Sequence, residues 1–338
     1  MQSKPSHVFI SGVAGFLGSH LADRMIELGH RVSGCDNLQG GYLSNVPKKV
    51  EFYNVDLSDH EAMNPLLKGV DIVFHAAATA YDGFSVFSPH FVTQNVYSNT
   101  VSLASASINQ GVKRFVYCSS MARYGEQQIP YNEDLAPRPI TPYGVAKYAA
   151  ELALKSLCDI HGMEYCICVP HNIIGPRQKF DDPYRNVAAI MMNRMLQGNQ
   201  PIIYGDGDQK RCFSYIGDTL QTFEQLAFSP TAKNQVVNVG PDEEFVSINE
   251  LARTIATVLD FELDPIYFNK RPGESRWATC SADKARKLFS YSTQYTLEDG
   301  IRKMAEWMKS VGPKPFQYNL DLEIKNQRVP KTWQENIL

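Results

Sequence analysis

The chain has 338 residues, of which 43% are hydrophobic and 20% charged, the balance of a globular protein rather than a disordered one. A formal net charge of -3 gives no sign of a nucleic-acid-binding surface, and no apolar run approaches the ~18 residues of a membrane span. Residues 1–6 are polar and lack a signal-peptide core, and the seven cysteines are scattered with no C-x-x-C pair. We therefore expect a cytoplasmic protein with reduced thiols and with no metal, nucleic-acid or membrane partner.

Short apolar runs alternate with amphipathic stretches through the first half of the chain. In chain order, strands are expected over 7–11, 31–36, 50–54, 72–76, 114–118 and 165–169, and helices over 16–28, 95–110 and 142–161. Strands that alternate with helices predict an α/β fold with a doubly wound parallel sheet covered on both faces.

The amino-acid composition changes from Asn172 onward. Proline and glycine become frequent, as in GPRQKFDDPY and IIYGDGDQKR, and further helices are expected over 186–197 and 247–259. We expect a smaller, mixed α/β substrate domain here, with a polar tail after Gly312 that wraps the surface. The predicted division is a cofactor domain over 1–171 plus about 213–240, and a substrate domain over 172–212 plus 241–338.

A glycine motif follows the first strand. The segment VFISGVAGFLG places Gly12, Gly15 and Gly18 where they permit a tight turn, close approach of backbone to a pyrophosphate, and tight packing of the helix. The helix N-terminus then offers free N–H groups to phosphates. Asp36 ends the second strand about 20 residues on, where a carboxylate can bind a ribose 2′-hydroxyl, and no arginine follows it to receive a 2′-phosphate. The motif predicts NAD on a Rossmann sheet; a structural glycine turn with a surface aspartate is the plain alternative.

A possible catalytic set lies at the next strand and helix. Tyr143 and Lys147 form a Y-x-x-x-K pair, and residues four apart lie on one face of a helix. The ammonium can stabilise the phenolate and lower the pKa of Tyr143, and an oxidised nicotinamide adds further positive charge. Ser120, just past a strand, can complete a hydrogen-bonded set around a substrate hydroxyl. The set indicates acid–base chemistry coupled to hydride transfer; an exposed Tyr/Lys helix pair is the other interpretation.

Together these motifs resemble one family. The chain is similar to the extended short-chain dehydrogenases/reductases, and specifically to NAD-dependent nucleotide-sugar epimerases of the UDP-glucose 4-epimerase kind. The likeness covers roughly Val8 to Leu288 and rests on GVAGFLG, HAAA, CSSMARYG, PYGVAK, HNIIGPRQ, YGDGDQKRCFSYIGD and RPGESR.

The resemblance implies a role for each matching residue. Ser120 and Tyr143 would face the sugar C4 hydroxyl, and Lys147 would bind the nicotinamide ribose. Asn172 would bind the diphosphate, the backbone of Asn186 and Val187 the base, Arg211 and Arg271 the diphosphate, and Glu274 the nucleotide ribose. The implied NAD-binding set is Gly12, Gly15, Phe16, Leu17, Gly18, Asp36, Asn37, Asp56, Leu57, Ala76, Ala77, Asn95, Tyr143 and Lys147. The implied substrate set is Ser85, Ser120, Asn172, Asn186, Val187, Arg211, Arg271, Glu274 and Ala278.

Some positions depart from the family pattern. Cys212 stands where the family usually has aspartate, and His171 where an aromatic residue is usual. The sugar-facing loop 79–90 also departs, so that Ser85 can be either a sugar contact or a helix or turn cap. Asp56 would equally suit a turn or helix cap.

The residues after Ser120 bear on the reaction. The related 4,6-dehydratases carry an Asp-Glu pair there, whereas this chain has Met121 and Ala122, which cannot transfer a proton. A C4-oxidised sugar can therefore be re-reduced but is not set up for elimination. Re-reduction on the opposite face inverts C4, so the sequence favours epimerisation.

The choice of sugar depends on fewer positions. Ala278 falls where glucose/galactose-restricted epimerases carry tyrosine, which leaves room for a 2-acetamido group. We therefore favour UDP-N-acetylhexosamine, with UDP-glucose and UDP-galactose also accepted. A UDP-glucuronate 4-epimerase stays open because Arg177 or Arg185 could reach a carboxylate, although Asn172 replaces the threonine usual there.

Two alternatives to an epimerase stay open. They are a nucleotide-sugar 4-dehydrogenase or ketoreductase, and a catalytically silent nucleotide-binding protein. Family members commonly dimerise through two helices per subunit, so we expect a homodimer formed by the helices over 95–110 and 142–161.

Overall fold

A central parallel sheet organises the fold. The computed structural model describes residues 5–338, so part of the polar N-terminus considered above, residues 1–4, lies outside the described residues. Seven parallel strands lie in the order β11-β6-β5-β4-β1-β2-β3. The predicted doubly wound Rossmann sheet is confirmed. The strands are β1 (His7–Ser11), β2 (Arg31–Asp36), β3 (Glu51–Asn54), β4 (Ile72–His75), β5 (Arg114–Cys118), β6 (Glu164–Pro170) and β11 (Gln235–Val239).

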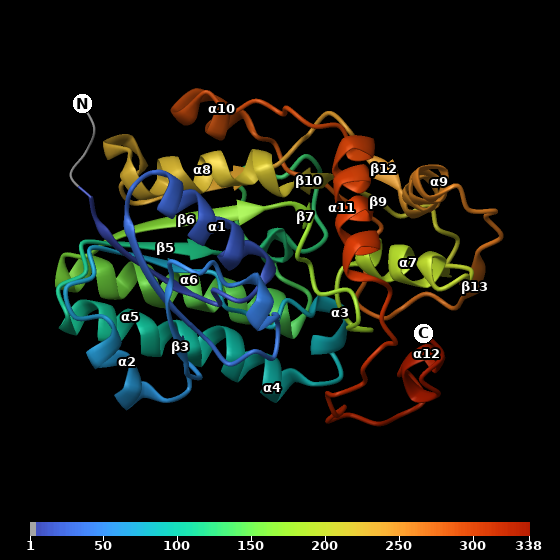
Figure 1. Cartoon of the computed structure of the whole chain (residues 1–338), viewed down its shortest axis with the longest axis horizontal. Helices are drawn as coiled ribbons and strands as arrows, with labels where there is room; N and C mark the ends of the chain where they lie inside the picture. Colours follow the sequence, from blue (N-terminus) through green and yellow to red (C-terminus); the bar gives the residue numbers. More distant parts are fainter. Residues whose placement is uncertain (1–4) are drawn as a thin grey trace.

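Alternate residues of the strands feed two hydrophobic layers. On β5, Phe115 and Tyr117 pack toward one face and Val116 toward the other, as the two-residue period of a strand requires. One face is covered by α2 (His60–Leu66), α5 (Asn99–Asn109) and α6 (Pro142–His161). The other is covered by α1 (Phe16–Glu27), α8 (Ile216–Phe228) and α10 (Asp283–Phe289) (Figure 1).

Helix α6 is the longest helix and has clear signals at both ends. The Thr141 hydroxyl oxygen accepts a hydrogen bond from the Gly144 N–H, Pro142 occupies the first turn, and Gly162 ends the helix at a left-handed φ of 79°. These signals explain why the predicted range 142–161 agrees with the structure. None of the helices in residues 5–338, including α6, is long and apolar enough to cross a membrane.

The helix predicted over 95–110 is confirmed, but its first turn is not a regular α-helix. Residues Gln94–Ser98 form a π-helical turn, η2, between α4 (Pro89–Thr93) and α5. The Asn95 side-chain amide donates to the Phe91 carbonyl (2.9 Å), which would accept the Asn95 backbone N–H in a regular α-helix. Wide turns of this kind are often found near functional sites.

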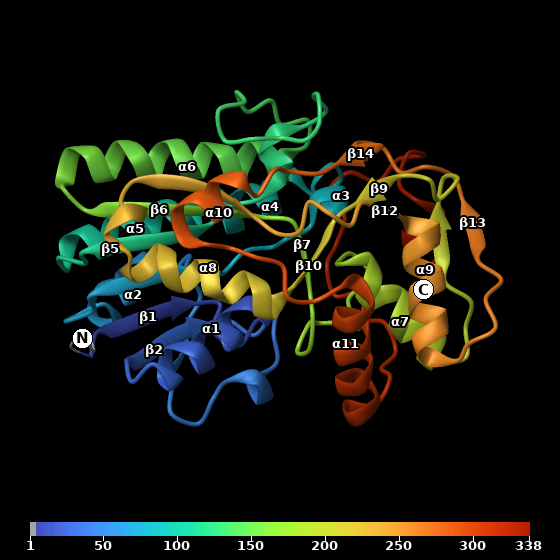
Figure 2. The same ribbon diagram turned by 90° about the horizontal axis from the view of Figure 1, so that it is seen from above.

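The C-terminal part has its own core. Helices α7 (Val187–Leu196), α9 (Ile248–Leu259) and α11 (Leu297–Val311) enclose it beside the sheet (Figure 2). Helix α11 was not predicted from the sequence, although Thr296 and Asp299 form a capping box that signals its start. The small sheets pair β7 (Asn172–Ile174) with β10 (Phe213–Tyr215), β8 (Ile202–Tyr204) with β13 (Ile266–Phe268), and β9 (Lys210–Arg211) with β12 (Val246–Ser247) and β14 (Trp277–Ala278).

Short helical segments complete the chain. They are η1 (Leu43–Asn45), α3 (Asp82–Ser85), η3 (Met121–Tyr124), η4 (Pro230–Ala232) and α12 (Lys331–Gln334). The predicted two-domain division stays a prediction. Helix α10, which that division assigns to the substrate domain, packs on α8 and β11 of the sheet layer.

The tail after Gly312 is anchored and does more than cover the surface. Trp333 is buried, and its ring lies 5.2 Å from that of Tyr184 and 6.3 Å from that of Phe84, measured between centroids. The Glu323 carboxylate accepts hydrogen bonds from the first N–H groups of α4, at 2.8 and 2.9 Å. The tail therefore holds α3 and α4, which overlap the loop 79–90 that was predicted to face the sugar (Figure 1).

Candidate active site

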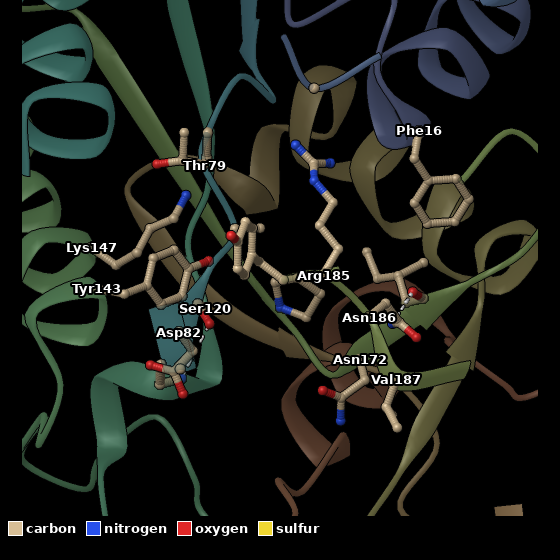
Figure 3. A pocket seen from close by; sticks show the side chains of 18 of the residues that line it. Phe16, Thr79, Asp82, Ser120, Tyr143, Lys147, Asn172, Arg185, Asn186 and Val187 are labelled. Atoms are coloured by element: carbon tan, nitrogen blue, oxygen red, sulfur yellow. Dashed lines mark hydrogen bonds between the residues drawn. The ribbon is translucent and has the colours of Figure 1, made fainter. Parts of the chain in front are cut away.

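A cavity of about 490 Å³ lies at the carboxyl ends of the central strands, where doubly wound folds bind their ligands. Its walls come from the first glycine turn, the ends of β2, β4 and β5, the start of α6, and segments of the C-terminal part (Figure 3). Every residue of the predicted NAD and substrate sets lines this cavity, with the exception of Ser85.

The glycine turn is sterically required. Gly12 has a φ of +73°, and a Cβ on it would lie 2.7 Å from the Ala77 Cα. A Cβ on Gly18 would lie 2.1 Å from the Gly12 carbonyl oxygen, so α1 packs directly on the turn. Gly15 precedes α1 and no side chain caps that helix, which leaves its first N–H groups available to an anion.

Two carboxylates lie at the next strand ends. Asp36 accepts hydrogen bonds from the Ala14 N–H (3.0 Å) and the Leu38 N–H (2.7 Å), so its position is fixed by the turns on both sides. Burial raises the pKa of Asp36, against the opposing effect of these hydrogen bonds. Asp56 accepts from the Asn37 amide at 2.6 Å.

A buried histidine ties these strand ends together. The His75 ring nitrogens lie 2.7 Å from the Ser11 hydroxyl and 2.9 Å from the Thr100 hydroxyl, which links β1, β4 and α5 below Ala76. Burial, helped by the charge of Lys147, lowers the pKa of His75 to about 3. His75 is therefore a neutral structural group.

The predicted catalytic residues meet on one wall of the cavity. Tyr143, Ser120 and Lys147 project from α6 and from the end of β5 (Figure 3). The Lys147 ammonium donates to the Cys118 carbonyl at 2.7 Å and lies 5.9 Å from the centre of the Tyr143 ring. Burial raises the pKa of Tyr143, a hydrogen bond with Ser120 opposes that effect, and Lys147 is not among the main influences. In the protein alone, the pKa of Tyr143 is therefore raised, contrary to the expected lowering by Lys147.

Ser119 has a structural role beside this set. Its hydroxyl donates to the buried Glu151 carboxylate, which also forms an ion pair with Arg123 at 3.2 Å. The side chains of Glu151 and Arg123 are 0% and 4% exposed, so each charge depends on the other for compensation. The contact fastens the end of β5 to α6.

The residues predicted to bind the diphosphate and the nucleotide ribose form a charged cluster in the same cavity. Arg271 pairs with Glu274 (3.3 Å), and the Arg271 guanidinium lies 4.6 Å from the centre of the Tyr204 ring. Arg211 donates to the backbone carbonyls of Ser275 and Arg276 in the same loop. Burial alone would raise the pKa of Glu274, but the two arginines lower it. The cluster holds two guanidinium groups at one end of the cavity.

The asparagines are placed by their own hydrogen bonds. The Asn172 side-chain amide donates to the Cys212 carbonyl (2.9 Å), and the Asn186 side-chain Oδ1 accepts from the Ala188 N–H (2.9 Å) and caps α7. Cys212, which replaces the usual aspartate, is buried with its sulfur 3.2 Å from the Thr279 hydroxyl. His171 contacts the Pro241 carbonyl at 2.9 Å, and burial lowers the pKa of His171 to about 4.

Ser85 requires a correction. Its fully buried hydroxyl donates to the Asp82 carbonyl (2.6 Å) and accepts from the Tyr143 N–H (3.1 Å), and the residue does not line the cavity. Its contacts correspond to the capping alternative. The predicted sugar contact at Ser85 was therefore wrong, because its hydroxyl caps the start of α6.

Three residues that line the cavity were not predicted from the sequence to lie where the structure places them. The Thr79 hydroxyl is buried without a hydrogen-bond partner among residues 5–338. Arg185 pairs with Asp182 (3.2 Å), and a Cβ on Gly40 would lie 2.5 Å from a terminal Arg185 nitrogen, so Arg185 points to the cofactor half. Asp82 faces the cavity beside Ser120 and Tyr143 (Figure 3). No sequence motif marks these residues, which lie in two segments far apart in the chain, 79–82 and the residues before α7.

The residues present fit NAD. The Cβ-free glycine turn and the uncapped start of α1 suit a pyrophosphate, and Asp36 suits a ribose. The unpartnered Thr79 hydroxyl is a further polar group for the cofactor. Within residues 5–338 no group of three His, Cys, Asp or Glu side chains could hold a metal ion.

Comparison with protein families gives a match over residues 8–240 to the model described as the NAD dependent epimerase/dehydratase family. A putative UDP-glucose 4-epimerase of Methanocaldococcus jannaschii is 33% identical over 90% of this chain and 98% of that protein.

Solved structures similar to this chain also include nucleotide-sugar 4-epimerases. A UDP-N-acetylglucosamine 4-epimerase of Methanobrevibacter ruminantium, in complex with UDP-N-acetylmuramic acid, is 31% identical with a TM-score of 0.85, over 92% of this chain and 100% of that one. A UDP-glucuronic acid 4-epimerase of Bacillus cereus, in complex with UDP-glucuronic acid and NAD, is 25% identical with a TM-score of 0.84, over 90% of this chain and 100% of that one.

The buried His75 predicts a loss of stability in acid. Its pKa is about 3 in the fold and 6.5 ordinarily, so between these values the unfolded chain binds the additional proton. The free energy of unfolding should fall by about 2 kcal/mol through His75 alone from pH 7 to pH 5. Urea unfolding at both pH values measures it. His75→Asn should show a smaller fall than the exposed-site control His161→Asn, and equal falls in the two variants would contradict the prediction.

Proposed function

Because the chain belongs to the NAD dependent epimerase/dehydratase family, we propose that this NAD-dependent nucleotide-sugar enzyme inverts C4 of a UDP-hexose through a transient 4-keto sugar. The observation that carries the proposal is the meeting of Tyr143, Ser120 and Lys147 on one wall of the cavity that also contains the glycine turn. We favour UDP-N-acetylglucosamine and UDP-N-acetylgalactosamine as substrates, with UDP-glucose and UDP-galactose also accepted.

Tyr143 is the acid–base residue of the proposed reaction. As the phenolate, Tyr143 takes the proton of the sugar C4 hydroxyl while C4 is oxidised, and the resulting phenol returns that proton when the ketone is reduced. Ser120 holds the phenol and the sugar oxygen in line, and its hydrogen bond favours the phenolate. NAD, when bound, supplies the site that accepts the hydride and gives it back. Lys147 is held by the Cys118 carbonyl, where its charge can act on both the cofactor ribose and the phenolate.

Inversion requires the 4-keto sugar to turn over while its nucleotide stays bound. The charged cluster of Arg211, Arg271 and Glu274 supplies binding energy away from the reacting carbon. Met121 and Ala122 line the reacting end and carry no group that could hold the sugar in one orientation or move a proton for elimination. Re-reduction on either face is therefore the outcome that this pocket favours.

The residues also bear on the choice of sugar. Ala278 lines the cavity, and its small side chain leaves space for an acetamido group. Of the two arginines considered for a uronate, Arg177 pairs with Asp23 on α1 (2.6 Å) and does not line the cavity. Arg185 pairs with Asp182 and faces the cofactor half. These contacts weigh against UDP-glucuronate 4-epimerisation, the alternative represented among the relatives.

A 4-dehydrogenase or ketoreductase is the second alternative. It would use exchangeable cofactor and give a net absorbance change at the nicotinamide, whereas an epimerase regenerates its cofactor in every cycle. The pocket residues serve both reactions, so cofactor balance separates them.

Incubation with UDP-GlcNAc, UDP-glucose and UDP-glucuronate, followed by NMR of the products, tests the proposal. We expect the C4-inverted sugar from at least one neutral substrate, without net change in nicotinamide absorbance. Tyr143→Phe should lose at least about 100-fold in turnover while still binding NAD, because it lacks the acid–base group.

Tyr148→Phe is the matched control for this experiment, since Tyr148 lies on the same helix but does not line the cavity. Near-normal turnover in Tyr143→Phe would reject the assigned base. The absence of C4-inverted product from all three substrates would reject the proposed function.

Ala278→Tyr tests the basis for an acetamido sugar. The larger ring should fill the space next to β9 and lower kcat/KM for UDP-GlcNAc by about tenfold or more relative to that for UDP-glucose. The ratio of the two values within each protein is the measurement. An unchanged ratio would show that Ala278 does not contact the sugar substituent.

We further propose a cytoplasmic homodimer. All seven cysteines are unpaired, in keeping with a reducing compartment. On α6, Val145, Leu152 and Ile160 are apolar and exposed, as expected of a helix that packs against a second copy.

Sedimentation of the wild type and of Leu152→Glu tests the dimer. We expect a wild-type dimer and a shift of the variant toward monomer, because the new carboxylate would be buried in an apolar contact. Leu43→Glu is the control, since Leu43 is similarly exposed (57% against 49% for Leu152) but lies outside α6. A wild-type monomer, or equal behaviour of both variants, would contradict the proposal.

A further inference from the structure

Asp82 is a charged residue of the cavity wall to which the proposed reaction gives no role. It opens α3 in the sugar-facing loop, and it lies on the same wall as Ser120 and Tyr143 (Figure 3). Asp82 is exposed and lines the cavity. A carboxylate in this place can act directly on a bound sugar.

Three hydrogen bonds fix Asp82 relative to the catalytic tyrosine. Its Oδ1 accepts from the Thr141 hydroxyl, the group that caps the start of α6. The Asp82 carbonyl accepts from Ser85, whose hydroxyl oxygen accepts from the Tyr143 N–H (3.1 Å). The carboxylate and the phenol are therefore held on one rigid unit, and Oδ2 is left for a ligand.

Charges at both ends of the sugar region act on Asp82. Although Asp82 keeps accessible surface, desolvation by the surrounding protein raises its pKa, while the Thr141 hydrogen bond and the charges of Arg271 and Arg211 oppose that shift. In turn, the Asp82 charge contributes to the raised pKa of Tyr143, after burial as the main cause. Asp82 thus lies within electrostatic range of both the reacting carbon and the diphosphate anchors, and a sugar held between them passes beside it.

Within residues 5–338, four cationic side chains line the cavity, and each already has a partner: Lys147 the Cys118 carbonyl, Arg185 Asp182, Arg211 backbone carbonyls, and Arg271 Glu274. Arg211 and Arg271 already act on the charge of Asp82, and in the proposed function they also hold the diphosphate. A carboxylate on the sugar would therefore add a further negative charge beside Asp82, which is unfavourable for two like charges. A hydroxyl or an amide N–H on the sugar could instead donate to Asp82.

We propose that Asp82 is a specificity-determining residue that accepts a hydrogen bond from a neutral UDP-hexose or UDP-N-acetylhexosamine and repels a UDP-uronate. The inference rests on the proposed function, because that function places the sugar C4 at Tyr143 and the diphosphate at the arginines. It adds the reason why this pocket selects the neutral sugar.

Asp82→Asn is the direct test, because asparagine keeps an oxygen for the Thr141 hydroxyl and removes only the charge. We expect the ratio of kcat/KM for UDP-glucuronate to that for UDP-GlcNAc to rise by about tenfold or more. A neighbouring like charge commonly shifts an ionisation by at least about one pKa unit, which is a factor of ten. Asp134→Asn, at an exposed position outside the cavity, is the matched control and should leave the ratio unchanged.

Calorimetric binding of both nucleotide sugars to the same proteins separates two kinds of failure. If no C4 inversion occurs with any sugar, the proposed function fails, and the ratio of the two Kd values still tests Asp82. If neutral sugars are inverted but Asp82→Asn leaves both ratios unchanged, the Asp82 inference fails and the epimerase stands. A wild type that prefers UDP-glucuronate overturns the inference.

Two further observations complete the design. Incorporation of solvent deuterium at the sugar C5 by the wild type, and its loss in Asp82→Asn, would mean that Asp82 abstracts a proton and would also overturn the inference. Circular dichroism checks that the variant is folded, and Asp82→Ser, which is neutral and keeps a hydroxyl, replaces Asp82→Asn if it is not. The same tenfold rise is expected from Asp82→Ser.

Discussion

The packing of α6 against the carboxyl end of β5 is the contact on which the rest of the site depends. Lys147 donates to the last carbonyl of β5, and one helical turn further on Glu151 pairs with Arg123 and accepts from Ser119. Burying these charges is costly unless they are paired, so few relative placements of strand and helix satisfy them. Tyr143, one turn before Lys147, is thereby held over the same strand end.

This contact divides the cavity into parts with different physical tasks. The glycine turn and the strand-end carboxylates form a rigid cofactor half, fixed by steric closeness at Gly12 and Gly18. The arginine cluster forms a charged end that suits a diphosphate. Between them Met121 and Ala122 leave the reacting end without strong anchors. A sugar that must present both faces requires strong binding at the nucleotide and weak, orientation-tolerant contacts at the ring.

The parts predictable from sequence are those encoded by local spacing. Gly12 to Gly18, Asp36 and the Tyr143–Lys147 pair all lie in regular elements, and the structure gathers them in the cavity as their spacing predicts. The direction in which the pKa of Tyr143 shifts could not be predicted, because the burial of Tyr143 depends on segments remote in sequence. Ser85 was misassigned for a related reason: a serine in an irregular loop bonds to whatever backbone the tertiary fold brings to it, here the Tyr143 N–H.

The sugar-facing loop depends on contacts that join distant parts of the chain. The Glu323 carboxylate bonds to the first N–H groups of α4, more than 200 positions earlier, and Trp333 packs on Phe84, two residues after Asp82. Asp82 in turn bonds to the cap of α6. A local glycine turn and a local helix motif therefore encode the hydride chemistry, whereas packing between the tail and the loop sets the wall that the sugar meets. Under the proposed function, changes in the tail would alter the choice of sugar without changing Tyr143, the proposed acid–base group.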